Sequence, residues 1–291
     1  MLYKIKSNFI LNTIFKNVKD IVKLNMIKHS KKWLIRLNIN KKEFKEYEKL
    51  KEFNKKCYTD IKEFQMEDLD LSNQLFDNRE LIYLTNMKFN NLKYIDLSSN
   101  NISDIKILEN ALFQKLEILD LSYNSISDIT VLNRVKFEKL KKLYLNYNHI
   151  SDIKVLENVN FKELKELDLN RNNISDIEIL KEAKFPRLEK LCLHRNIISD
   201  IKVLKNVNFK DLEELSLSSN NISDIQVLRE VKFENLKILY LNNNKISDIK
   251  VLDNAKFNKL EKFYLSNNQI NKEVYSEIIK NLRLKIKEFY I

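Results

Sequence analysis

The chain contains no glycine among its 291 residues and a single proline, Pro186. Without glycine, no glycine-rich loop can cradle a phosphate, so the common nucleotide-binding motifs are excluded. Positions that need a left-handed backbone are predicted to use asparagine or aspartate, which tolerate that conformation best after glycine.

Cysteine is also scarce, since only Cys57 and Cys192 are present and they lie far apart. Two distant cysteines do not form a disulfide framework. The chain has no run of 18 apolar residues, and its N-terminus lacks an apolar segment followed by a small-residue cleavage site. These absences predict an intracellular, cytoplasmic protein with no membrane span and no signal peptide.

The positive charge is concentrated at the N-terminus. Residues 1–66 contain 17 Lys and Arg against 7 Asp and Glu, a net charge of +10. The remaining residues contain 35 against 34, a net charge of +1. This difference predicts two regions with a boundary near residue 66: a basic N-terminal region over 1–66 and a second domain over 67–291.

The second region repeats every 24 residues without an insertion. Eight asparagines keep this spacing: Asn100, Asn124, Asn148, Asn172, Asn196, Asn220, Asn244 and Asn268. A leucine precedes each asparagine by eight residues: Leu92, Leu116, Leu140, Leu164, Leu188, Leu212, Leu236 and Leu260. A fixed period of this length predicts a solenoid of stacked coils.

Within one coil, each position has a structural role. Leu167 and Leu169 alternate with polar residues, which predicts a short strand with the leucines inward. A buried asparagine such as Asn172 can satisfy backbone groups where the chain turns. Asp176 precedes apolar residues at helical spacing, so the Ser-Asp pair predicts a capped helical turn on the outside, and Phe185 fills the core.

The stretch from Leu92 to Asn268 resembles a leucine-rich repeat protein. Its Asn-x-Ile-Ser-Asp-Ile segment is similar to the repeats of bacterial internalins and of protein-phosphatase regulators with 22-residue repeats, although each coil here is two residues longer. The resemblance implies an α/β fold: a right-handed solenoid with a curved parallel sheet inside and short helical turns outside.

Atypical coils are predicted at both ends of the regular array over 92–270. A degenerate coil over 67–91 uses Leu69 and Leu71 as its strand. A C-terminal cap over 271–291 is predicted to begin with a helix capped by Asn271 and lined by Val274, Ile278 and Ile279. A last strand is expected over 284–291.

The basic region is predicted to be all-helical, with a final charged helix over 41–56. Residues 9–37 contain Ile10-Leu11-x-x-Ile14-Phe15, then Leu24 and Ser30-Lys31-Lys32-Trp33. This order resembles an F-box, a small helical module that docks on the adaptor of cullin ubiquitin ligases. The resemblance implies a ubiquitin-ligase adaptor as partner through residues 9–37.

Two other roles for the basic region remain open. It can be a helical cap over the end of the solenoid, or a basic arm on nucleic acid or an anionic membrane. Glu43, Glu46 and Glu48 interleave with the lysines of the last helix, which favours a solvated helix over phosphate binding. Nucleic acid is therefore not expected as a partner.

The outward strand positions are predicted to be free for binding, because the core is formed by other positions. Tyrosine and arginine, which are enriched at interface hot spots, gather there in the middle coils. The candidate partner-binding residues on the concave face are Tyr123, Tyr144, Tyr147, Asp168, Arg171, His194, Arg195, Tyr240 and Tyr264.

No catalytic residue, metal site or cofactor is predicted. Cys192 and His194 share a strand face, but two side chains supply neither an oxyanion site nor a metal ligand set. The sequence therefore predicts a non-catalytic protein-interaction scaffold. The alternatives are an F-box-like substrate receptor of a ubiquitin ligase and a regulatory subunit that binds an enzyme such as a phosphatase.

Overall fold

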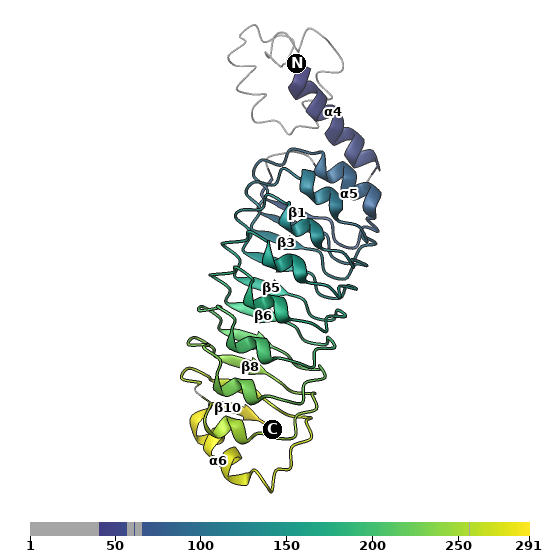
Figure 1. The fold of residues 1–291 in the computed structure, drawn as a ribbon. Helices are drawn as coiled ribbons and strands as arrows, with labels where there is room; N and C mark the ends of the chain where they lie inside the picture. Colours follow the sequence, from purple (N-terminus) through teal and green to yellow (C-terminus); the bar gives the residue numbers. More distant parts are fainter. Residues whose placement is uncertain (1–40, 57–60, 62–65, 256) are drawn as a thin grey trace.

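The computed structural model describes residues 41–56, 61, 66–255 and 257–291 (Figure 1). They form a stack of coils whose strands make one ten-stranded sheet in sequence order, with each strand parallel to the next. The strands are β1 (Asp68–Asp70), β2 (Tyr94–Asp96), β3 (Ile118–Asp120), β4 (Lys142–Tyr144), β5 (Glu166–Asp168), β6 (Lys190–Cys192), β7 (Glu214–Ser216), β8 (Ile238–Tyr240), β9 (Lys262–Tyr264) and β10 (Glu288–Tyr290). The predicted solenoid with a parallel sheet is confirmed.

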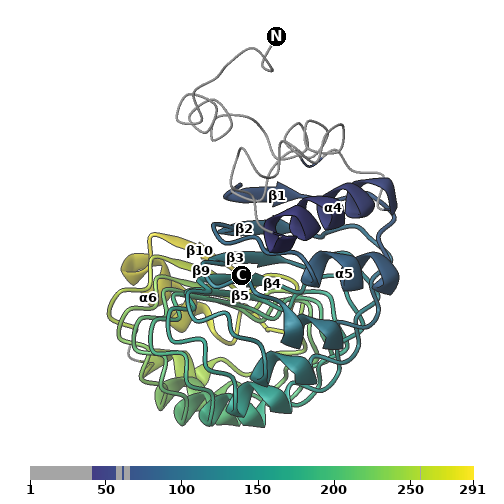
Figure 2. The ribbon, with the colours of Figure 1, turned by 90° about the horizontal axis from the view of Figure 1, so that it is seen from above.

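Short 3-10 helices lie on the side opposite the sheet. They are η2 (Lys106–Asn110), η3 (Thr130–Asn133), η4 (Lys154–Glu157), η5 (Glu178–Lys181), η6 (Lys202–Lys205), η7 (Gln226–Arg229) and η8 (Lys250–Asp253). Seen from above, these helices lie along the outer side of the solenoid, while the strands lie toward the middle (Figure 2). The sheet therefore occupies the inner side of the solenoid.

Each coil follows the alternation in its sequence. Leu167 and Leu169 are buried, whereas Glu166 and Asp168 point out of the sheet. Asp176 accepts a hydrogen bond at 2.8 Å from the N–H of Glu178, the first residue of η5. The predicted outer turn is present, but its N-cap is Ile177, which makes no side-chain capping hydrogen bond, and Asp176 bonds to the turn from the preceding position. Ile177 and Leu180 pack inward.

The repeated asparagines bind neighbouring coils to one another. The Asn172 amide nitrogen donates to the carbonyls of Leu145, at 3.0 Å, and Leu169, at 3.1 Å. Its oxygen accepts from the N–H of Ile150 at 2.9 Å. Equivalent bonds recur from Asn100 to Asn268. This asparagine ladder satisfies buried backbone groups in two coils at once.

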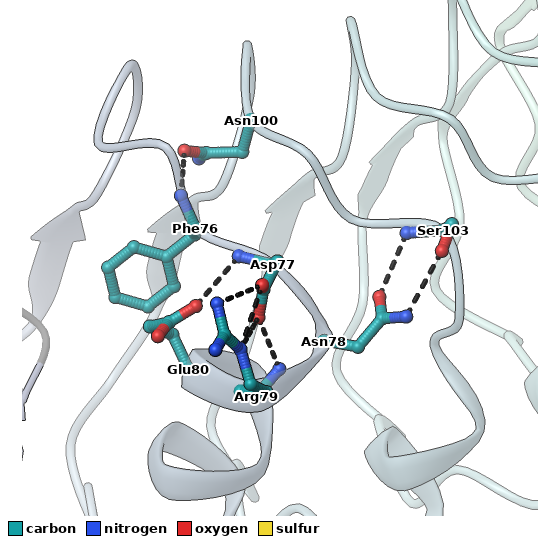
Figure 3. A network of polar contacts seen from close by, with 7 residues as sticks. All are labelled: Phe76, Asp77, Asn78, Arg79, Glu80, Asn100 and Ser103. Atoms are coloured by element: carbon teal, nitrogen blue, oxygen red, sulfur yellow. Dashed lines mark hydrogen bonds and ion pairs between the residues drawn. The ribbon is translucent and has the colours of Figure 1, made fainter.

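The N-terminal end of the stack is closed by two helices. Helix α5 (Asn78–Thr85) replaces the 3-10 turn of the first coil. Its start is a capping box in which Asp77 accepts from the N–H of Arg79 while Glu80 accepts from the N–H of Asp77 (Figure 3). Asn100 reaches back to this coil by accepting from the N–H of Phe76 at 2.9 Å.

Helix α4 (Lys41–Lys56) lies against this first coil and is the helix expected over 41–56. Leu50 and Phe53 are buried, and the rings of Phe53 and Phe76 lie 6.4 Å apart. The helix therefore covers the apolar end of the solenoid. The F-box-like segment over 9–37 lies outside the described residues, and the boundary near residue 66 stays a prediction.

The C-terminal cap differs from the prediction in detail. Strand β10 pairs with β9, and α6 (Ser276–Lys285) precedes it. Asn271 caps the turn before this helix, because it accepts from the N–H groups of Glu273 and Val274. Val274 is 66% exposed, and Leu284 lies in the helix at 79% exposure. Their predicted places in the apolar helix face and in the last strand are wrong, because the strand begins only after Ile286 turns the chain.

We predict that Asn172→Ala lowers the free energy of unfolding by about 1–3 kcal/mol, the cost of one buried donor left without an acceptor. The substitution leaves the Ile150 N–H without its partner in the core, whereas the carbonyls of Leu145 and Leu169 each keep one asparagine donor, from Asn148 and Asn196. Urea denaturation followed by circular dichroism measures the loss.

The matched control is Asn173→Ala, next in the chain and exposed. It should change stability by no more than about 0.5 kcal/mol, as surface substitutions generally do. Equal effects of the two substitutions would contradict the role of the ladder.

Candidate functional site

The inner face of the sheet presents the outward side chains of the strands in columns, because the strands are in register with no offset between equivalent residues. We call this surface the sheet face. The predicted candidates lie on it: Tyr144, Asp168, Tyr240 and Tyr264 are on strands, and the others follow the strands at the turn.

The first column is a chain of ion pairs. Lys142 lies 3.1 Å from Glu166, and Lys190 lies 3.8 Å from Glu166 and 3.3 Å from Glu214. Alternating charges on adjacent strands stabilise one another. The prediction that the outward positions are free for binding takes no account of these contacts, which neighbouring coils make between the side chains of this column.

The second column is partly buried despite facing outward. Cys192 is 4% exposed and Ser216 is 8% exposed. Burial raises the pKa of Asp168 to about 6, with Glu166 and Asp120 adding repulsion and Lys190 opposing it. Burial also raises the pKa of Tyr144, whose hydroxyl donates to Glu166 at 3.1 Å.

Asp168 differs from the other aspartates of its column in its hydrogen bonds. Asp70 and Asp120 each accept from the N–H and the hydroxyl of the serine two residues on, at 2.6–2.9 Å. Asp168 is followed at that position by Asn170, whose N–H donates at 2.9 Å. The Asn170 side-chain oxygen accepts from the N–H of His194 at 2.6 Å. Asp168 thus has a backbone donor but no serine hydroxyl.

The residue before each ladder asparagine has a left-handed backbone. These residues have φ between 52° and 57°: Ser99, Tyr123, Tyr147, Arg171, Arg195, Ser219, Asn243 and Asn267. The prediction that asparagine or aspartate occupies such positions is wrong for six of them. The stack imposes the conformation, since the N–H of Tyr147 donates at 2.9 Å to Asn170 of the next coil. A bulky residue there costs about 1–2 kcal/mol.

Four predicted residues occupy successive left-handed positions and form what we call the rim stack: Tyr123, Tyr147, Arg171 and Arg195. The Tyr123 and Tyr147 rings are stacked with centroids 3.9 Å apart. The Arg171 guanidinium lies 4.3 Å from the centroid of the Tyr147 ring, in cation–π geometry. Tyr123 is 48% exposed and Arg195 is exposed, so the rim stack is open to a partner.

Tyr240 and Tyr264 belong to a second group, which we call the tyrosine stack. Their rings are 4.7 Å apart, and Tyr290 extends the stack at 4.9 Å from Tyr264. Tyr290 is absent from the predicted site because the last coil breaks the repeat. Its place in a strand after the cap helix is the signal that could have found it, since Tyr290 pairs with Tyr264 in the sheet.

A hollow of about 420 Å³ lies on the sheet face over β5–β9 and joins the predicted groups. Asp168 and His194 line one end, and Tyr240 and Tyr264 line the other. The floor between them is formed by small side chains, among them Cys192 and Ser216. Arg171 and Arg195 of the rim stack follow β5 and β6 but do not line this hollow.

The Cys192 and His194 pair is not arranged as a nucleophile and its base. Burial raises the pKa of the Cys192 thiol, whereas a nucleophilic cysteine needs a lowered one. Burial lowers the pKa of His194, and its Nδ1 lies 2.7 Å from the hydroxyl of Ser218. Within the described residues, no three His, Cys, Asp or Glu side chains are grouped to hold a metal ion.

Comparison with known families identifies the fold. The profile of the family described as leucine-rich repeats in two copies matches residues 90–134, 114–159, 138–182, 162–206 and 210–254, more than half of the chain. The chain is a leucine-rich repeat protein. A comparison with curated proteins finds no significant match. No helix in the described part of this leucine-rich repeat protein is long and apolar enough to cross a membrane.

Solved structures of the same fold include two internalins of Listeria monocytogenes. The internalin inlF is 29% identical with a TM-score of 0.58, and the match covers 71% of this chain and 56% of inlF. Internalin C2 is 26% identical with a TM-score of 0.52, and the match covers 70% of this chain and 80% of internalin C2.

A third structure is a leucine-rich repeat protein of Leptospira interrogans. It is 24% identical with a TM-score of 0.56, and the match covers 76% of this chain and 59% of the other protein. This leucine-rich repeat protein therefore spans little more than half the length of inlF and of the Leptospira protein.

We predict that Asp168→Asn stabilises the protein above pH 6 and leaves its stability unchanged near pH 3.5. The folded-state pKa of about 6 lies above the unfolded value near 3.9, so the folded chain binds the extra proton between these values. The contribution of Asp168 to the free energy of unfolding of the wild type is thus fully present below pH 4, where the carboxyl is protonated, and is lost as the pH rises through 6. Melting temperatures of both proteins at pH 3.5, 5 and 7.5 measure the difference.

Asp70→Asn is the control of opposite sign. Hydrogen bonds from the Ser72 N–H and hydroxyl lower the pKa of Asp70, so neutralising it should not stabilise the protein at pH 7.5. A stabilising effect of the same size from both substitutions would show that the loss of any negative charge, and not the burial of Asp168, is responsible.

Proposed function

We propose that this leucine-rich repeat protein is a non-catalytic scaffold that binds a protein partner on the sheet face, with the rim stack as the centre of the contact. The observation that supports this most is which amino acids occupy the positions with a left-handed backbone. Asparagine occupies the equivalent positions at Asn243 and Asn267, yet tyrosine and arginine occupy the four positions of the rim stack.

The backbone explains why this choice is informative. Asparagine tolerates the left-handed conformation, whereas tyrosine and arginine do so at a cost in stability. Unfavourable backbone conformations that persist in a fold cluster at binding and functional sites. The cost at Tyr123, Tyr147, Arg171 and Arg195 is therefore better explained by a contact with a partner than by the folding of the coil.

The side chains of the rim stack are also arranged for tight binding. Stacking on the Tyr147 ring restricts the Arg171 guanidinium before any partner arrives. A side chain that is already ordered loses less entropy on binding. Tyrosine and arginine are the residue types most enriched at interface hot spots. The rim stack thus combines suitable chemistry with preorganisation.

The comparisons support an interaction role in general terms. The chain belongs to a repeat family whose long, exposed inner surfaces serve as extended binding surfaces. The internalins establish the fold and name no partner. The alternatives remain predictions. Docking to a ubiquitin-ligase adaptor concerns residues 9–37. The hypotheses of a phosphatase regulator and of an intracellular location rest on the sequence alone.

We predict that Tyr147→Ala combined with Arg171→Ala weakens partner binding by at least about 2 kcal/mol, or roughly 30-fold in Kd. Both stacking contacts of Tyr147 are lost, and the sheet and its core are untouched. Partners isolated from cell extract on the immobilised wild-type protein provide the ligand for a quantitative titration of each variant.

The control variant is Arg134→Ala combined with Tyr275→Ala, which removes the same two residue types away from the sheet face. Arg134 is exposed and pairs with Glu109, whereas Tyr275 is partly buried and donates to Asp248 at 3.1 Å. Circular dichroism confirms folding of both variants. If the rim variant binds as tightly as the control, the partner does not use the rim stack.

A further inference from the structure

The hollow on the sheet face has the dimensions of a site for one extended side chain. Along the second column, Asp168 pairs with Cys192, Cys192 with Ser216, and Ser216 with Tyr240. Adjacent strands are about 4.8 Å apart, so Asp168 and Tyr240 are separated by about 14 Å with only two small residues between them. The floor over Cys192 and Ser216 is therefore low, with a taller residue at each end.

The wall at Asp168 offers a carboxylate with spare acceptor capacity. Its one hydrogen bond among the described residues comes from the N–H of Asn170. The aspartates Asp70 and Asp120 have a serine hydroxyl in addition, and Asp96 has the hydroxyl of Tyr94 at 2.9 Å. A carboxylate can accept about four hydrogen bonds, so Asp168 can take donors from a ligand.

The wall at Tyr240 offers an aromatic face. One face of the ring is covered by Tyr264, because the two rings are 4.7 Å apart and only 12° from parallel. The opposite face is directed toward the column position of Ser216, whose side chain is too small to cover it. Aromatic faces attract cations and the methylene stems of basic side chains.

The charges that line the hollow favour a cation. Its lining includes the carboxylates of Asp168 and Glu214 and the ammonium of Lys190. The Lys190 charge is shared by Glu214 and Glu166, which lie 3.3 and 3.8 Å away. Burial and the nearby Arg195 and Arg171 lower the pKa of His194, which favours the neutral imidazole.

We propose that this hollow binds a basic side chain of the protein partner, an arginine in the best fit. The guanidinium pairs with Asp168, and the methylene stem lies along the floor toward the open face of Tyr240. The planar guanidinium can donate two parallel hydrogen bonds to one carboxylate, which a lysine cannot do. The inference rests on the proposed function, since it names the chemistry that a partner presents to the sheet face.

The probe for this site is N-acetyl-arginine amide, titrated into the full-length 15N-labelled protein at pH 7.5 and followed by NMR. We expect saturable shifts of the backbone signals of Cys192, Ser216 and Tyr240. N-acetyl-citrulline amide, which has the same shape without the charge, should bind at least about tenfold more weakly. N-acetyl-glutamate amide should leave these signals unchanged.

Three substitutions locate the binding. Asp168→Asn keeps the size of the side chain and should weaken arginine binding at least about fivefold. Ser216→Phe fills the floor and should abolish it. Asp96→Asn, the matched control in the same column, should leave it unchanged, because Asp96 lies outside the lining of the hollow. Unfolding midpoints identify any variant that fails to fold, and Asp168→Asn decides the question if Ser216→Phe does not fold.

Equal affinity for the arginine and citrulline probes, or arginine binding that Asp168→Asn does not weaken, overturns the inference. That failure differs from a failure of the proposed function. If partner binding depends on Tyr147 and Arg171 while the arginine probe does not bind, the scaffold role stands and the hollow is not a site for a basic side chain. If Tyr147→Ala with Arg171→Ala leaves the affinity for the partner unchanged, the rim stack is not the binding surface, regardless of whether the arginine probe binds.

Discussion

The asparagine side chain between neighbouring coils is the contact on which the rest of the structure depends. A 24-residue coil has only three strand residues and one short helical turn, so much of its backbone has no partner within its own secondary structure. Asn172 supplies those partners to two coils simultaneously. Its hydrogen bonds hold each coil at one height relative to the next, and because the amide is buried, a shifted coil would leave polar groups unsatisfied.

Exact stacking has consequences for the surface as well as for the core. Equivalent residues of adjacent coils lie one strand spacing apart, so outward side chains interact with their counterparts. This spacing produces the alternating ion pairs around Glu166 and Lys190, the stacked tyrosines, and the desolvated carboxylate of Asp168. It also forces a left-handed backbone on Tyr147 and Arg171, whose stability cost is the main argument for a binding role.

Repetition made most of the fold predictable. Residues equivalent to Leu167, Leu169, Asn172 and Phe185 recur in the other regular coils, so each coil predicts the same buried positions. The candidate site was less predictable. The sequence pointed to the tyrosines and arginines of the sheet face, but Tyr290 lies outside the repeat, and its place beside Tyr264 depends on the turn after α6.

The solenoid, its period and the division of residues into core and surface follow from local spacing and were therefore predictable from the sequence. Which surface residues touch one another depends on how the coils stack in three dimensions. Asp168, Cys192, Ser216 and Tyr240 lie 24 residues apart in the chain and become neighbours when the coils stack. The burial of Asp168 and the openness of the hollow depend on the sizes of residues in neighbouring coils. Neither property can therefore be predicted from the sequence of one repeat.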